Sequence, residues 1–374
     1  MKFADVIGQE GVKSHLLQMV QEDRLPHALM FCGPRGAGKL PLALAFAGYL
    51  LCESPSERER CGVCRSCQMF QAWAHPDLHF SFPVYKKKAT DNTISDDYLP
   101  QWREQLGRNV YFGLEEWLND IKAENQQVVH YVGESDSLQR KLALRASQGG
   151  RRVVVLWLPE RMKTEMANKL LKIIEEPPTR THFLLVSEEP DMVLGTIQSR
   201  VQRIQVPALS ENDIAEALMS RFALPEKEAR DAAHVAQGNY TTALARQQQG
   251  NEEEMFFEFF VQLMRLSYGK QVRDLRDWAE RVSDLGRERQ KRLLGYCQRL
   301  LRENFIYNFH RPEMTFQTTA ESNFSTRFSP FINERNVIGI MDELSDAQRD
   351  IEQNVNARMV FFDFALKMII LLKQ

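Results

Sequence analysis

Short runs of apolar residues alternate with helical patterns through the first half of the chain. A run of four to eight apolar residues is typical of a strand that is buried on both faces of a sheet. Such runs predict strands at residues 28–31, 128–132, 153–158 and 183–187. Apolar positions with a period of three to four residues predict helices at 12–20, 42–47, 102–125, 138–147 and 166–176. Strands that alternate with helices predict an α/β fold with a doubly wound parallel sheet.

After Pro207 the apolar runs stop and helical patterns take over. Short helices are predicted within 210–250 and a loop at 310–333. Longer helices are predicted at 254–267, 272–284, 288–306 and 336–373. The chain therefore divides into an α/β domain over residues 1–207, a small helical lid over 208–250 and an all-α C-terminal domain over 251–374.

The first predicted strand leads into a glycine-rich turn at residues 33–40, which reads Gly-Pro-Arg-Gly-Ala-Gly-Lys-Leu. This sequence is one residue short of a P-loop, in which backbone N–H groups surround a phosphate chain. Gly33, Gly36, Gly38 and Lys39 are the candidate nucleotide-binding residues. A P-loop ends in Ser or Thr because that hydroxyl binds the magnesium ion. Leu40 stands in this position, so the turn predicts weak or vestigial nucleotide binding.

Four cysteines follow with the spacing C-x(8)-C-x(2)-C-x(2)-C, at positions 52, 61, 64 and 67. Thiolates at two-residue gaps can bind one tetrahedral zinc ion, and the more distant cysteine completes the shell. Cys52, Cys61, Cys64 and Cys67 therefore predict a structural zinc module over 52–67. An iron–sulfur cluster is an alternative, although residues 68–71 offer no further cysteine of the ferredoxin type. Scattered core cysteines are the third possibility.

Composition limits the cellular location and the kinds of partner that the protein can have. The 374 residues carry a formal net charge of −2, so the chain has no overall basic field for nucleic acid. The N-terminus has no apolar leader, and the apolar stretch at 359–372 is too short for a bilayer. We expect a cytoplasmic protein without disulfides and without a membrane contact. The basic run at 86–88 could contact DNA, but a solvated loop is the favoured interpretation.

Several motifs occur together in one order. They comprise Ile-Gly-Gln-Glu at 7–10, Leu-Pro-His-Ala-Leu at 25–29, the glycine-rich turn, the cysteine module, Asn-Lys-Leu-Leu-Lys-Ile-Ile-Glu-Glu-Pro-Pro at 168–178, and Ser-Arg-Val at 199–201. In this the chain resembles the bacterial clamp-loader branch of the AAA+ proteins. The motif-bearing match spans about residues 5–245. The C-terminal domain fits the family's collar by position and helix content alone.

The resemblance implies a ring of subunits that binds ATP, opens a sliding clamp and places it on primed DNA. The implied partners are the other clamp-loader subunits, the clamp and the DNA, and collar domains hold the ring together. In this family a Ser-Arg-Cys motif supplies an arginine finger to the ATP of a neighbouring subunit. Arg200 is the matching residue, although Val201 departs from the motif. A forked, permanently charged guanidinium suits the charge that develops on a transferring phosphoryl group.

The same resemblance exposes further departures. Trp157 and Leu158 stand where the family has its Walker B Asp-Glu pair, and the nearby Glu160 lies beyond Pro159. Thr241 replaces the lid arginine called sensor 2, and Ser187 is a weak match to the sensor 1 residue. Without these groups, hydrolysis would lack both metal binding and water activation. We therefore expect a subunit that does not hydrolyse ATP and that donates Arg200 to a neighbour.

Two alternatives remain open. One is a clamp-loader ATPase with an unorthodox site, since Lys39 and the loop glycines persist. The other is a stand-alone, zinc-dependent DNA-binding protein built on the cysteine module and the basic run.

Overall fold

The computed structural model describes residues 1–86, 88, 91–123, 126–144, 146, 150–309 and 314–373, and gives no side chains for 248–251. The chain forms two compact units. Unit 1 contains residues 1–222 and 238–242, and unit 2 contains 223–237 and 243–374. The segment 208–250 is thus divided between the two units, and the separate lid domain stays a prediction.

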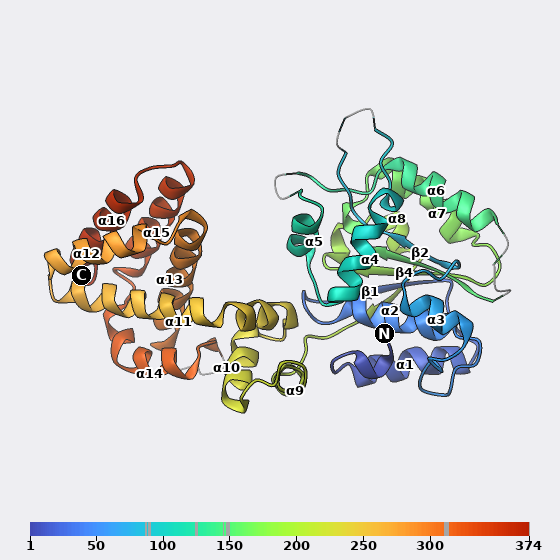
Figure 1. Ribbon diagram of the computed structural model, residues 1–374, viewed down its shortest axis with the longest axis horizontal. Coiled ribbons are helices and arrows are strands. Elements are labelled where there is room, and N and C mark those ends of the chain that lie inside the picture. The colour runs from blue at the N-terminus through green and yellow to red at the C-terminus, as the bar shows by residue number, and fades with distance from the viewer. Residues whose placement is uncertain are drawn as a thin grey trace. The chain divides into compact units, whose positions relative to one another are not determined.

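Unit 1 is built on a five-stranded parallel sheet with the order β2-β3-β4-β1-β5 in the described residues (Figure 1). Its strands are β1 (Ala28–Cys32), β2 (Leu78–Ser81), β3 (Arg152–Trp157), β4 (Thr181–Ser187) and β5 (Gln202–Gln205). β1 pairs with β4 on one side, where Leu29 is opposite Leu184, and with β5 on the other. The parallel sheet with helices confirms the predicted α/β part of the chain.

Helices cover both faces of this sheet. They are α1 (Glu10–Gln21), α2 (Lys39–Leu51), α3 (Arg65–Gln71), α4 (Leu99–Arg108), α5 (Leu114–Asp120), α6 (Val132–Ala143), α7 (Thr164–Glu175) and α8 (Gly195–Gln198). Unit 1 also contains α9 (Glu211–Phe222). One apolar core joins α1, α2, α4 and α5 to one face of the sheet. A second core joins α6, α7 and α8 to the other face. Because successive strand side chains alternate, Val153 and Val155 enter the first core and Val154 and Leu156 enter the second.

The first core is dense in aromatic rings. Trp102 on α4 stacks on Phe82 with ring centroids 4.2 Å apart. The same indole contacts Trp117 and Trp157, each at 5.2 Å between centroids. Trp157 at the end of β3 is therefore a core residue, fixed by packing.

Unit 2 is helical throughout its regular structure. It contains α10 (Glu226–Ala236), most of α11 (Tyr240–Tyr268), α12 (Val272–Ser283), α13 (Arg287–Tyr307), α14 (Thr319–Phe328), α15 (Val337–Glu352) and α16 (Ala357–Leu371). A core of its own includes Phe260, Leu300, Leu344 and Phe361. An independent core is what a separately folding domain requires.

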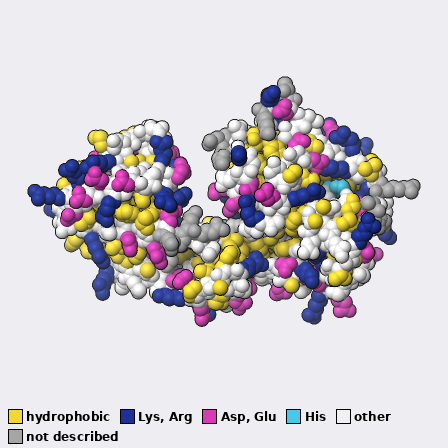
Figure 2. Space-filling view, viewed as in Figure 1, with side chains coloured by type: hydrophobic (Ala, Val, Ile, Leu, Met, Phe, Trp, Pro, Cys, Tyr) yellow, Lys and Arg dark blue, Asp and Glu magenta, His cyan; other side chains and the backbone are white. Residues whose placement is uncertain are grey.

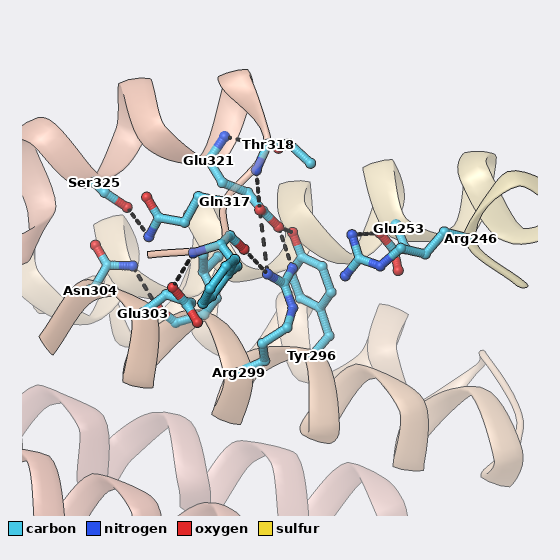
Figure 3. A network of polar contacts seen from close by, with 12 residues as sticks. Arg246, Glu253, Tyr296, Arg299, Glu303, Asn304, Gln317, Thr318, Glu321 and Ser325 are labelled. Atoms are coloured by element: carbon cyan, nitrogen blue, oxygen red, sulfur yellow. Dashed lines mark hydrogen bonds and ion pairs between the residues drawn. The ribbon is translucent and has the colours of Figure 1, made fainter. Parts of the chain in front are cut away.

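Polar contacts fasten α14 to α13 inside unit 2 (Figure 3). The buried carboxylate of Glu321 accepts hydrogen bonds from the Tyr296 hydroxyl at 2.7 Å and from the Thr318 backbone N–H at 2.8 Å, and it pairs with Arg299. Glu303 accepts the backbone N–H of Phe316 at 2.7 Å. Each buried carboxylate is therefore satisfied by donors, as burial of charge demands.

Several predicted elements were wrong in detail. Residues 128–132 form isolated bridges at Val129 and His130, because β3 already has a strand on each side. The helix predicted at 102–125 is two helices, since the Asn109 side chain bonds the backbone of Tyr111 and breaks the pattern. The predicted loop at 310–333 contains α14. The helix predicted at 336–373 is α15 and α16, and the Asn356 side chain caps the second.

Two strands were missed from the sequence. β2 is only four residues long, and β5 is an edge strand in which Ile204 alone is buried. No helix among the described residues is long and apolar enough to cross a membrane.

Buried histidine makes the stability of unit 1 pH-dependent. His130 is buried, with Nδ1 3.1 Å from the Ser81 hydroxyl and Nε2 3.0 Å from the Trp157 carbonyl. Burial lowers the pKa of His130 from 6.5 to about 4, so the folded protein holds the neutral ring. The stability that this provides is complete above pH 6.5 and is lost as the pH falls from 6.5 towards 4.

We expect the free energy of unfolding to fall by about 2 kcal/mol through His130 between pH 7.5 and pH 5. Urea unfolding of the full chain at the two pH values measures this. His130→Gln, which keeps a donor for the Trp157 carbonyl, should lose less on acidification than the wild type. His15→Gln, at an exposed position on α1, is the matched control and should lose as much as the wild type. Equal losses in all three proteins would contradict the assignment.

Candidate functional site

The glycine-rich turn lies between β1 and α2, as a phosphate loop requires. Gly36 and Gly38 have φ values of 69° and 84°, in the left-handed region that favours glycine. Gly33 lies so close to the backbone carbonyl of Val206 that a Cβ would collide with it. The backbone geometry of a phosphate loop is therefore present.

The side chain of Lys39 is folded back onto this loop. Its Nζ donates to the carbonyl oxygens of Gly33 at 2.8 Å and Pro34 at 2.6 Å. Burial lowers the pKa of Lys39, and the negative charges of Glu188 and Glu160 act in the opposite direction. The ammonium is thus balanced by carbonyl dipoles and carboxylates of its own chain.

Other side chains of unit 1 pack against the same loop. The backbone N–H of Tyr240 donates to the Gly36 carbonyl at 3.2 Å. The Tyr111 ring lies against Gly38, and its hydroxyl accepts the backbone N–H of Ile7 at 2.8 Å. The rings of Tyr111 and Tyr240 meet edge to face, with centroids 4.8 Å apart. Two tyrosines of unit 1 therefore lie against the loop, and one of them bonds the Gly36 carbonyl.

Four positions depart from the ATPase pattern, and their side chains offer neither a ligand for magnesium nor a positive charge for the phosphate chain. Leu40, Trp157 and Leu158 have side chains in the first apolar core. Thr241 donates its hydroxyl to the Asn239 side chain at 2.5 Å. At these four positions the geometry offers neither a magnesium ligand nor a cation for the phosphate chain.

Carboxylates at the carboxyl end of the sheet were undervalued from the sequence. Glu160 accepts the Ser187 hydroxyl and the backbone N–H of Glu188, both at 2.9 Å. Glu188 pairs with Arg35 at 2.9 Å, and burial raises the pKa of Glu188. Because β3 and β4 are neighbours and parallel, residues just after them meet at one edge. That rule could have located both carboxylates beside the loop.

Arg200 lies just past α8 on the surface of unit 1. Its Nε pairs with Glu175, the last residue of α7, and its Nη1 donates to the Thr196 carbonyl at 2.8 Å. The Arg200 side chain remains 35% exposed. Within the described part of the chain, its polar contacts are to α7 and α8 and not to the phosphate loop. Arg200 and the phosphate loop at 33–40 therefore do not form one site within this chain.

The four predicted cysteine ligands are brought together. The sulfur atoms of Cys52, Cys61, Cys64 and Cys67 all lie within 4.8 Å of one another. The Sγ–Sγ distance is 3.5 Å between Cys52 and Cys61 and 3.9 Å between Cys61 and Cys67. A tetrahedron with zinc–sulfur bonds of about 2.3 Å has edges of about 3.8 Å. The thiols are thus spaced for one ion rather than for a cluster of several irons.

The surroundings of the sulfur atoms also suit a metal. The backbone N–H of Cys61 points to the sulfur of Cys52, that of Cys64 to Cys61, and that of Cys67 to Cys64, at 3.3–3.4 Å. The N–H of Cys64 lowers the pKa of the Cys61 thiol to about 6, whereas burial raises the pKa of Cys52 to about 12. A divalent cation supplies the charge that would deprotonate all four thiols.

The basic run at 86–88 lies partly outside the described residues, since Lys87 is not described. The ammonium groups of Lys86 and Lys163 lie over the Tyr131 ring, 4.7 and 5.1 Å from its centroid. On the face drawn in Figure 2, basic and acidic side chains are interspersed over both units. Direct DNA binding by this run stays a prediction.

A parallel sheet whose first strand passes through a glycine-rich loop into a buried helix defines a P-loop fold. The family model described as DNA polymerase III, delta subunit, matches residues 8–210, and the chain belongs to this family. This confirms the resemblance to the clamp-loader branch.

Curated relatives carry the same kind of name. The chain is similar to the DNA polymerase III subunit delta' of Escherichia coli, with 29% identity over 231 residues that cover 62% of this chain and 57% of the relative. The delta' subunit of Pseudomonas aeruginosa is 32% identical over 174 residues, covering 46% and 41%. The gamma/tau subunit of Mycobacterium tuberculosis is 29% identical over 220 residues, covering 59% and 31%. The chain thus spans about half the length of the delta' relatives it matches.

Solved structures resemble the chain more distantly. The RuvB Holliday junction branch migration motor of Thermotoga maritima has a TM-score of 0.40 and 14% identity, covering 69% of this chain and 66% of that one. A DNA polymerase III gamma subunit-related protein of the same organism has the same TM-score and identity, covering 95% and 98%.

The cysteine geometry predicts one zinc ion per chain after purification under reducing conditions, measured by elemental analysis. Cys64→Ser removes one of the four thiolates, so it should lower the zinc content and the midpoint of thermal unfolding. Cys297→Ala is the control, since this cysteine is buried in unit 2 away from the cluster, and it should keep the zinc. Iron in place of zinc, or no metal in the wild type, would refute the prediction.

Proposed function

We propose that this chain is a clamp-loader subunit in DNA replication, which helps a ring of subunits to load a sliding clamp onto primed DNA. In this proposal it does not hydrolyse ATP itself, and it donates Arg200 to the ATP of a neighbouring subunit. The observation that carries the proposal is the contrast between two places in unit 1. The loop at 33–40 lacks its metal-binding partners, whereas Arg200 is half-exposed on a rigid mount.

The contacts around the loop support the loss of hydrolysis. Phosphoryl transfer needs a metal ion that bridges the phosphates and a group that orients the attacking water. Leu40 cannot bind magnesium, and Trp157 and Leu158 cannot replace a carboxylate pair. Lys39 is committed to the carbonyls of Gly33 and Pro34. A nucleotide would have to displace these contacts, so its binding is weak or absent.

The names of the relatives support the proposed assignment of partners. Delta' and gamma/tau are both subunits of DNA polymerase III, so we assign this chain to the same assembly. The partners would be the other clamp-loader subunits, the sliding clamp and the primed DNA held by the complex. Unit 2, with its own apolar core, is suited to act as the collar domain that joins subunits.

The zinc module has a structural role in this proposal. Four thiolates fill a tetrahedral shell and leave no open position for a substrate. The module runs from the end of α2 into the first turn of α3, and the two helices pack together. A zinc ion would therefore hold the excursion at 52–67 against α2.

One observation favours the alternative of an unorthodox ATPase. Glu160 lies at the carboxyl end of the sheet, and its negative charge opposes the lowering of the Lys39 pKa by burial, so a carboxylate does lie near the loop. It is engaged by Ser187 and a backbone N–H, as a structural group would be.

The isolated chain should show no ATP turnover above a preparation of Lys39→Ala, because it lacks both metal binding and water activation. Phosphate release measured with magnesium, with and without primed DNA, tests this. Turnover that survives further purification and is abolished by Glu160→Gln would support the unorthodox ATPase and overturn the proposal. Equal, background rates for all three proteins are the expected result.

In a complex reconstituted with its ring partners, Arg200→Ala should remove the DNA-stimulated hydrolysis at the one site that this subunit serves. Arginine fingers contribute roughly 10³–10⁵ in turnover, so that site would be silent while others continue. Arg203→Ala is the matched control, since Arg203 is a nearby exposed arginine on β5. Size-exclusion chromatography would show that both variants assemble. Unchanged hydrolysis in an assembled Arg200→Ala complex would rule out the finger.

A further inference from the structure

The guanidinium of Arg200 is held by its own subunit at two of its three nitrogen atoms. Nε pairs with the carboxylate of Glu175. Nη1 donates to the Thr196 carbonyl at 2.8 Å and to the Ser199 hydroxyl at 3.1 Å. Among the described contacts, none involves Nη2. Since the side chain is 35% exposed, this nitrogen is the one left for a group outside the chain.

Both supports of the guanidinium are exposed residues on helices that pack against the sheet. Glu175 ends α7, and the preceding residues Leu170, Ile173 and Ile174 are buried against the sheet. Thr196 lies on α8 beside the buried Ile197. A carboxylate on one helix and a carbonyl on the other therefore define a fixed place and plane for the guanidinium.

This arrangement reduces the entropy that the Arg200 side chain would lose on contacting another subunit. A free arginine side chain loses rotamer entropy when it is immobilised. Contacts that already fix the side chain in the free subunit remove part of that cost from the reaction. An isolated surface ion pair contributes little to folding, so orientation of Arg200 is the more consequential effect of Glu175.

We propose that Glu175 is a positioning residue, which orients Arg200 so that Nη2 is presented to the phosphate chain of the neighbouring subunit's nucleotide. This inference rests on the proposed role of Arg200. It also distinguishes the two glutamates before Pro177, because only the first of them contacts Arg200. Glu175 holds the arginine, whereas the adjacent Glu176 is exposed and has no described contact with Arg200.

The test uses the reconstituted complex and its DNA-stimulated ATPase. Glu175→Ala should lower kcat at the served site by about tenfold and leave KM for ATP unchanged, because orientation affects the reaction more than nucleotide binding. Glu175→Gln keeps an acceptor oxygen for Nε and should lose less. Glu176→Ala, the matched control, should behave as the wild type. Loss in both alanine variants to the same extent would overturn the specific role of Glu175.

A double-mutant cycle separates positioning from a general effect on structure. Glu175→Ala should have no further effect once Arg200→Ala is present, because there is then no guanidinium to orient. An equal fold-loss in both backgrounds, or full activity of Glu175→Ala beside a defective Arg200→Ala, would overturn this inference and leave the proposed function intact. Full activity of Arg200→Ala itself would remove the proposed function and this inference with it.

Discussion

The unit 1 fold depends on the close contact between the phosphate loop and the segments that converge on it. Lys39 bonds the carbonyls of Gly33 and Pro34, and Gly33 lies against the backbone that follows β5. The carbonyl of Gly36 accepts a hydrogen bond from the backbone N–H of Tyr240 at the start of α11. The loop therefore contacts β1, the residue after β5 and the first residue of α11 through groups of the protein itself. This gives a physical reason why the glycines and the lysine can persist in a loop that has Leu40 in place of a hydroxyl residue.

The aromatic core explains why a carboxylate would be poorly tolerated at position 157. Trp157 occupies the end of β3, where a carboxylate would bind metal, and its ring contacts Trp102 and Phe112. An aspartate at this position would leave a cavity among these rings and would bury a charge in an apolar setting. A substitution of Trp157 by aspartate would therefore cost stability.

The sequence was informative where burial or chemistry alone decides the structure. The apolar runs located β1, β3 and β4, and the cysteine spacing located four thiols that do converge. It failed where tertiary contacts decide. β2 and β5 are short or polar strands that exist because β3 and β1 offer free edges. His130 falls in an apolar run, yet its ring bonds Ser81 and Trp157, and the run stays outside the sheet. The pairing of Arg200 with Glu175 joins positions 25 residues apart, and no local pattern signals it.

The two faces of the sheet separate the residues behind the phosphate loop from the helices that support Arg200. Leu40, Trp157 and Leu158 belong to the core that α1, α2, α4 and α5 form on one face. Arg200 is supported by α7 and α8, whose apolar residues belong to the core on the other face. Changes that fill the first core with apolar side chains therefore need not disturb the mount of the arginine. The side chains at positions 40, 157 and 158 and the contacts of Arg200 can therefore change independently of each other.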